Sequence, residues 1–198
     1  TAKFPNSYRA QMLRGTAESN FGYLTDALKS FGRAVELNPD SPEANFNLAM
    51  IQFAAGMPDA ARATLERGIK KFPGDAQHYQ EYASFEVQLA EAGDAGAEAR
   101  AYEALHRAVS LDKSLAKPHL LLGRLELKNN RLEQAVSELE TAATLDPHDA
   151  TVHLVLSRAY ARLGEADKAA KEAAAFKNTT QPELRSGRPR TRATLRRW

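Results

Sequence analysis

The chain has 198 residues, of which 43% are hydrophobic and 26% are charged, and its formal net charge is +2. This hydrophobic content excludes a wholly disordered chain, and the absence of cysteine excludes disulfides and thiolate metal sites. The apolar stretches end well short of the roughly 20 residues that a membrane-spanning helix requires, so no membrane span is predicted. The first residues contain neither an initiator methionine nor an apolar signal region, so we expect a mature or excised segment and assign no cellular location.

A lead-in over residues 1–7 precedes a pattern that repeats every 34 residues. This interval separates Pro39 from Pro73, and it also separates Ala27 from Ala61. Self-similarity at such a period is typical of a solenoid, in which each unit stacks on the next because it cannot bury its apolar face alone. The predicted repeats are 8–41, 42–75, 76–115, 116–149 and 150–176.

Each repeat is predicted to form two antiparallel helices, A and B. Small residues recur at positions 8, 20 and 27 of the repeat and bulky apolar residues at positions 7 and 24, with helical spacing inside each half. Helix A is expected to end in a left-handed residue near position 15, and proline at position 32 blocks the continuation of helix B. Ser41 is the expected N-cap of the second repeat, with Pro42 in the first turn. The residues near position 15 are Gly22, Gly56, Asn130 and Gly164, and the prolines are Pro39, Pro73 and Pro147.

These positions resemble the pattern of the tetratricopeptide repeat family over residues 8–176. The resemblance implies an all-α, right-handed superhelical solenoid of about five helix pairs. It also implies a non-catalytic protein–protein interaction scaffold whose partner is a protein or a peptide. The third repeat departs from the pattern by six extra residues around residues 90–98, which we interpret as a lengthened helix A with a longer turn. The alternative is a specific docking loop.

No catalytic, metal-binding or cofactor-binding constellation is predicted. His119 and His153 occupy the same position of adjacent repeats, but stacked helix pairs hold such positions about 10 Å apart. This separation is too large for one zinc ion, whose bonds are about 2 Å long. The glycines mark turns between helices and not phosphate-binding loops.

The family resemblance also implies a binding surface. In tetratricopeptide arrays the A helices line a concave groove, and positions 2, 5, 9, 12 and 13 point into it. In the first repeat these positions include Thr16, Ser19 and Asn20. The second repeat is apolar at these positions and the last two are basic, which favours a partner with apolar anchors and acidic residues or a free carboxylate. The candidate peptide-binding residues are Met12, Phe46, Met50, Phe53, Lys117, Arg124, Lys128, Arg158 and Arg162.

Two other interpretations of this surface exist. The basic positions could form an ordinary solvated wall, with Phe46 and Phe53 partly in the core. Chaperone-binding members of the family clamp a C-terminal carboxylate through lysine, asparagine and arginine at five positions, and only one of these positions matches here, so no such clamp is expected. The five positions hold Met12, Thr16, Asn47, Gln77 and Glu81.

The last segment, residues 177–198, has a net charge of +6, which leaves −4 for the rest of the chain. Residues 185–198 contain six arginines and no acid. We interpret this segment as a basic tail, which could be disordered or an expression remnant, or as a C-terminal cap. Binding to nucleic acid or an anionic surface is less favoured. Trp198 is the single aromatic residue of this segment, and one aromatic ring does not provide a stacking platform for successive bases. Self-association into a homo-oligomer is a further alternative.

Overall fold

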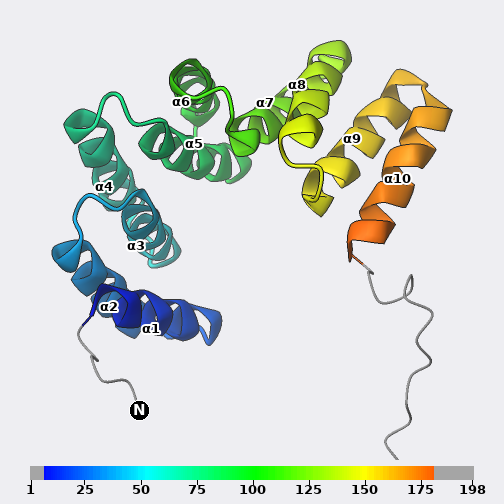
Figure 1. Cartoon of the computed structure of the whole chain (residues 1–198). Helices are drawn as coiled ribbons and strands as arrows, with labels where there is room; N and C mark the ends of the chain where they lie inside the picture. The colour runs from blue at the N-terminus through cyan, green and yellow to red at the C-terminus, as the bar shows by residue number, and fades with distance from the viewer. Residues whose placement is uncertain (1–6, 181–198) are drawn as a thin grey trace, which may run out of the picture. The chain divides into compact units, whose positions relative to one another are not determined.

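The structure is a computed structural model that describes residues 7–180 (Figure 1). Within these residues it contains ten α-helices and no β-strand, which confirms the all-α repeat fold. Most of the lead-in, residues 1–6, and the arginine-rich end, residues 181–198, lie outside the described residues. The helices are α1 (Tyr8–Asn20), α2 (Leu24–Leu37), α3 (Pro42–Ala54), α4 (Pro58–Lys71), α5 (Ala76–Glu91), α6 (Ala97–Leu111), α7 (Ala116–Lys128), α8 (Leu132–Leu145), α9 (Ala150–Leu163) and α10 (Ala166–Thr180).

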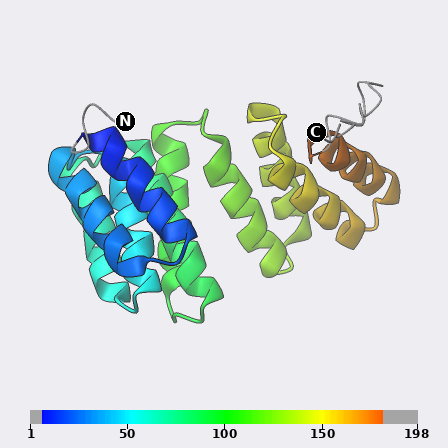
Figure 2. The same ribbon diagram turned by 90° about the horizontal axis from the view of Figure 1, so that it is seen from below.

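The chain divides into two compact units, Thr1–Leu122 and Gly123–Trp198. In the first unit, the A helices α1, α3 and α5 lie on one side and the B helices α2, α4 and α6 lie on the other (Figures 1 and 2). Successive helix pairs stack in chain order, because α2 contacts α3 and both α3 and α4 contact α5. In the second unit, α9 packs against both α8 and α10.

Small residues allow helices A and B to approach closely, as the repeat pattern predicted. A Cβ atom added to Gly15 would lie 2.8 Å from Cε1 of Phe31, well inside the contact distance of two carbon atoms. In the second unit, a Cβ atom on Gly123 would lie 2.5 Å from Cγ of Leu139. Position 8 therefore faces the bulky residue at position 24 of its own repeat. The buried residues at position 24 are Phe31, Leu65, Leu105 and Leu139, and the fully buried alanines at position 20 are Ala27, Ala61, Ala101 and Ala135.

The predicted helix boundaries in the turns are confirmed. The side chain of Ser41 accepts a hydrogen bond from the backbone N–H of Ala44 at 3.1 Å, and Pro42 begins α3. This bond satisfies one of the free N–H groups of the first turn. All four residues near position 15 have positive φ, which glycine and asparagine adopt more readily than other residues. Their φ angles are 77° at Gly22, 77° at Gly56, 58° at Asn130 and 85° at Gly164.

The extra residues of the third repeat lengthen helix A and the turn that follows it, as interpreted from the sequence. Helix α5 has 16 residues, whereas α1 and α3 have 13 each. The turn after α5 contains Gly93 and Gly96, both with positive φ, and it carries Asp94 between them. Asp94 turns back toward the helices of its own unit, where it joins an ion-pair network.

This network surrounds Glu86, a carboxylate on α5 whose side chain is fully buried. Nε of Arg62 on α4 donates to one carboxylate oxygen at 2.8 Å, and Nε of Arg100 on α6 donates to the other at 2.9 Å. Each arginine also donates to Asp94, at 3.0 and 2.8 Å respectively. The hydrogen bonds from Arg100 and Arg62 hold the pKa of Asp94 below its ordinary value. Two arginines and two carboxylates therefore meet at the junction of three helices, and the exposed Asp59 lies 3.7 Å from Arg62 at the edge of this network.

Removal of the central carboxylate tests this network. We expect Glu86→Ala to lower the free energy of unfolding by about 3–5 kcal/mol, because Arg62 and Arg100 lose the carboxylate that both of them bind. Urea denaturation followed by circular dichroism measures the change. The matched control is Glu36→Ala, which breaks an exposed pair with Arg33 and should cost at most about 1 kcal/mol. Equal losses from the two variants would contradict a central role for Glu86.

In the second unit, His153 links α9 to α10 and to the turn before α9. Its Nδ1 lies 2.7 Å from a carboxylate oxygen of Glu172, and its Nε2 lies 3.0 Å from the carbonyl oxygen of Pro147. Both ring nitrogens face acceptors, so the doubly protonated imidazolium satisfies both of them. Burial opposes this charge, but the hydrogen bonds to Glu172 and to the Pro147 carbonyl outweigh burial and raise the pKa of His153 above about 6.5. This histidine is therefore engaged in a structural bond.

The raised pKa makes the stability of the chain depend on pH. The folded state holds the His153 proton more tightly than the unfolded state does. The resulting stabilisation is therefore complete below about pH 6.5 and is lost as the pH rises through the higher folded pKa. We expect the free energy of unfolding of the natural chain, relative to His153→Gln, to fall as the pH rises above about 6.5. Urea titrations of both proteins across this range provide the measurement. Parallel pH profiles would show that His153 is not responsible.

Candidate peptide-binding face

The predicted binding residues of the first unit belong to the A helices, and their side chains differ in accessibility. Met12 on α1 is only 8% exposed and lies in the core cluster of the first repeats with Ala27 and Phe31. Met50 on α3 is partly exposed. We use the term A-helix face for the side of the first unit that carries α1, α3 and α5.

A small pocket opens on this face between α1 and α3. Its volume is about 200 Å³, and Phe31 and Ile51, which are both buried, supply apolar surface. Polar side chains from both helices also line it, and within residues 7–180 those of Ser19, Asn20 and Asn47 make no hydrogen bond. We call this cavity the A-helix pocket. Its lining residues are Thr16, Ser19, Asn20, Phe31, Asn47, Met50 and Ile51.

The structure brings Lys117 together with Phe46 and with an acid that the sequence analysis did not select. The Lys117 ammonium lies 5.3 Å from the ring centroid of Phe46 and 3.0 Å from a carboxylate oxygen of Glu81 on α5. Glu81 therefore balances the charge of Lys117 on the A-helix face. The sequence contained one indication that Glu81 lies on this face, because it occupies position 6 of its repeat. The sequence analysis considered that position only for the chaperone clamp.

Phe53 contributes to the packing between the second and third repeats. Its ring meets the ring of Phe85 edge to face, with centroids 5.9 Å apart and an interplanar angle of 89°. Phe85 is fully buried on α5, whereas Phe53 is partly exposed at the end of α3. This geometry is the favoured one for an aromatic pair, so part of the Phe53 surface is already used inside the unit.

In the second unit, the predicted basic residues lie on α7 and α9. Arg162 donates to the carbonyl oxygen of Leu127 at 2.6 Å and to the side-chain oxygen of Asn130 at 2.8 Å. These bonds satisfy the end of α7, where helix carbonyl groups lack partners. Arg158 is exposed and has no ion pair within residues 7–180. Arg124 is partly buried and Lys128 is exposed, and each has an interaction partner.

Among residues 7–180, no group of three or more histidine or acidic side chains is placed to hold a metal ion. None of the helices in this part of the chain combines the length and the apolar character needed to cross a membrane.

Comparison with known sequences identifies the repeat. A family model described as tetratricopeptide repeat matches residues 22–83, and a second model with the same description matches residues 120–179. The chain belongs to the tetratricopeptide repeat family. It is 27% identical over 160 residues to a tetratricopeptide repeat and J domain-containing co-chaperone of Fusarium oxysporum f. sp. lycopersici. That alignment covers 79% of this chain but only 30% of the co-chaperone.

Solved structures support the same fold. A thermophilic tetratricopeptide protein of Thermus thermophilus matches with a TM-score of 0.73 and 22% identity, over 90% of this chain and 94% of the other. PilF of Pseudomonas aeruginosa matches with a TM-score of 0.69 and 19% identity, over 87% of this chain and 76% of the other. The MamA protein matches with a TM-score of 0.62 and 18% identity, over 92% and 96% of the two chains. At these identities the likeness concerns the fold.

Membership of the family supports a general class of function. Tetratricopeptide repeat proteins are generally non-catalytic scaffolds, in which stacked repeats present extended surfaces to other proteins. The fold of this chain is accordingly that of a protein–protein interaction scaffold.

Proposed function

We propose that the protein is a non-catalytic adaptor that binds an extended peptide segment of a partner protein along its A helices. An apolar side chain of the segment enters the A-helix pocket of the first unit. Acidic residues of the partner bind basic side chains of the second unit as a separate contact. The observation that carries this proposal is the A-helix pocket, which combines apolar surface with polar groups that have no partner within residues 7–180.

The dimensions and chemistry of the A-helix pocket favour a peptide side chain. A volume of about 200 Å³ is smaller than the 300–1,000 Å³ typical of small-molecule and cofactor sites. Phe31 and Ile51 would contact an apolar side chain, and Met50 can adjust its shape because a thioether side chain is flexible. The amides of Asn20 and Asn47 carry donors and acceptors for the N–H and C=O groups of an extended backbone. Together these groups suit one apolar residue of a bound peptide.

The second unit supplies a cation for acidic residues of the partner. Arg158 is exposed on α9 and has no acidic partner in the described part of the chain. A guanidinium binds a carboxylate through two parallel hydrogen bonds, and such charge-assisted bonds contribute about 1.5–3 kcal/mol each. Lys128 and Arg124 on α7 add positive charge, although each already interacts with another group. We therefore assign the main contact to Arg158.

Two substitutions test the proposal separately in the two units. Met50→Arg places a charged side chain at the A-helix pocket, and Arg158→Glu reverses the charge on α9. Each should weaken binding of the same partner by about 10- to 100-fold, because each removes about 1.5–3 kcal/mol of interaction. Affinity capture from native lysate identifies the partner, and titration of the purified partner against each variant measures the affinity.

Each substitution has a matched control. Met57→Arg changes an exposed methionine before α4, and Lys171→Glu reverses an exposed charge on α10. Both controls should keep the affinity of the natural chain. The proposal fails if Met50→Arg and Arg158→Glu bind the partner as tightly as their controls do. Loss in the α9 variant alone would leave the A-helix pocket without a role.

A further inference from the structure

The outer side of α1 carries large apolar side chains that stay exposed within residues 7–180. Leu13 is 73% exposed, and Phe21 at the end of the helix is 75% exposed. Ala10 and Ala17 share this side, because spacings of three and four residues follow one face of a helix. Tyr23 is 61% exposed and stacks on Phe21, with ring centroids 6.3 Å apart. We call these five residues the outer stripe.

In later repeats the positions of the outer stripe form the contact with the preceding repeat. Ala10 and Ala17 occupy positions 3 and 10, which are buried where a helix pair precedes them: α3 follows α2, α5 follows α4, and α9 follows α8. Helix α1 is the first described helix and lies at the front of the first unit in Figure 2. The buried equivalents are Ala44 and Ile51, His78 and Phe85, and Val152 and Ala159.

The preceding helix meets these positions with a small residue. Ala34 of α2 belongs to the buried cluster that contains Ala44 of α3, and Gly68 of α4 leaves room for His78 of α5. Both small residues stand at position 27. In the last repeat this position holds Phe176 of α10, so the last helix of a second copy does not reproduce the internal contact. Head-to-tail stacking of copies is therefore disfavoured.

The outer stripe is instead complementary to itself in an antiparallel arrangement. Its side chains alternate in size along α1, small at Ala10, large at Leu13, small at Ala17 and large at Phe21. When two such helices lie antiparallel and are centred near residue 15, Leu13 of one copy faces Ala17 of the other. Phe21 then faces Ala10. Each large side chain meets a small one, as close helix packing requires.

We propose that two copies of the chain associate through the outer stripe, with their α1 helices antiparallel about a two-fold axis near residue 15. The contact continues the stacking surface that the later repeats use internally, and it covers Leu13, Phe21 and Tyr23. This association goes beyond the proposed peptide binding and is independent of it, because the outer stripe shares no residue with the A-helix pocket.

The exposed surface suits a weak, reversible dimer. An aromatic side chain can bury about 150–250 Å², so Phe21 and Tyr23 together expose on the order of 250 Å² in each copy. Leu13 and the exposed Arg9 and Arg14 beside the stripe add to this area. The total from two copies approaches the lower end of specific interfaces, about 1,200 Å². We therefore expect a dissociation constant in the micromolar range.

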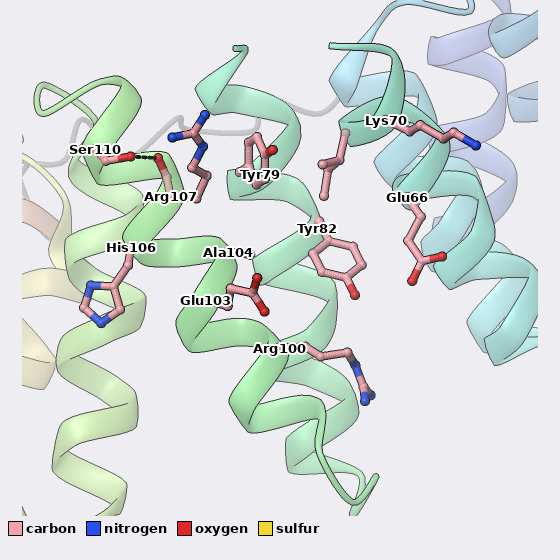
Figure 3. Close-up of a pocket in the computed structure, with 11 residues that line it drawn as sticks. Glu66, Lys70, Tyr79, Tyr82, Arg100, Glu103, Ala104, His106, Arg107 and Ser110 are labelled. Atoms are coloured by element: carbon pink, nitrogen blue, oxygen red, sulfur yellow. Dashed lines mark hydrogen bonds between the residues drawn. The ribbon is translucent and has the colours of Figure 1, made fainter. Parts of the chain in front are cut away.

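The B-helix side of the first unit has a larger opening, but its chemistry does not suit a contact between copies. A groove of about 740 Å³ lies between α4 and α6, with α5 between them (Figure 3). Glu66 and Glu103 line it from opposite walls, and both are exposed without an ion pair within residues 7–180. Two copies of this groove would bring four carboxylates together, which is unfavourable. The outer stripe contains no acid.

Sedimentation of the full chain over a range of concentrations tests the dimer. We expect a reversible equilibrium that stops at the dimer, because a two-fold contact uses the outer stripe of both copies. Leu13→Glu should weaken it at least about 10-fold, since each dimer would then bury two carboxylates. The control Leu37→Glu changes a leucine that is 40% exposed at the end of α2, and it should leave the equilibrium unchanged. Equal responses of the two variants would overturn the proposal.

Exchanging the sizes of two facing positions tests the antiparallel register. Leu13→Ala alone leaves a gap, and Ala17→Leu alone brings two leucines together, so each should weaken the dimer. The double variant Leu13→Ala with Ala17→Leu should restore the dissociation constant to within about 3-fold, because large again faces small. Circular dichroism checks that all variants keep their helices. General apolar attraction would instead be strengthened by Ala17→Leu, and that result would refute this register.

Other outcomes would assign the outer stripe to other occupants. Growth beyond the dimer would indicate head-to-tail association, because such contacts do not close on themselves. A chain that remains monomeric up to about 1 mM would leave the outer stripe to a helix of another protein or of a longer chain. Either result would overturn association through two antiparallel α1 helices.

Discussion

The close approach of neighbouring helices is the constraint on which the rest of the structure depends. Within the first repeat, Gly15 leaves room for the ring of Phe31, since a Cβ atom there would lie 2.8 Å from Cε1 of that ring. Between the second and third repeats, Gly68 of α4 leaves room for His78 of α5, which would lie 2.4 Å from such an atom. Small residues therefore act both inside a repeat and across the junction to the next. Stacking follows, because the bulky side chain of one helix needs the space left by another.

Polar contacts then adapt each repeat to its neighbours. In the first two repeats, the side chain at position 11 of helix A accepts a hydrogen bond from a hydroxyl of helix B, from Ser30 to Glu18 at 2.6 Å and from Thr64 to Gln52 at 2.9 Å. In the third repeat, position 11 is Glu86, and its carboxylate is bound by two arginines of neighbouring helices. The longer turn of this repeat supplies a second carboxylate, so the insertion completes the charge balance of a buried site.

The two sides of the first unit differ in chemistry, and this difference has functional meaning. Within the described residues, the A helices present a small pocket with apolar surface and polar side chains that lack partners, whereas the B helices enclose a larger groove with tyrosines and unpaired carboxylates. The first of these sides suits the backbone and an apolar side chain of a peptide. A repeat scaffold can hold both because successive helix pairs expose the A and B helices on opposite sides.

The sequence by itself determined the repeat period, the ten-helix order and the left-handed turn residues, because helical spacing, small residues and glycine conformations are local properties. It also placed Met50 on the face that carries a pocket. The tertiary structure decided which side chains remain available. Met12 is buried, Arg162 binds the end of α7, and Lys117 is paired with Glu81 from another repeat. Periodicity assigns a residue to a face of its helix, but its partners come from helices far away in the chain, and only folding brings them into contact.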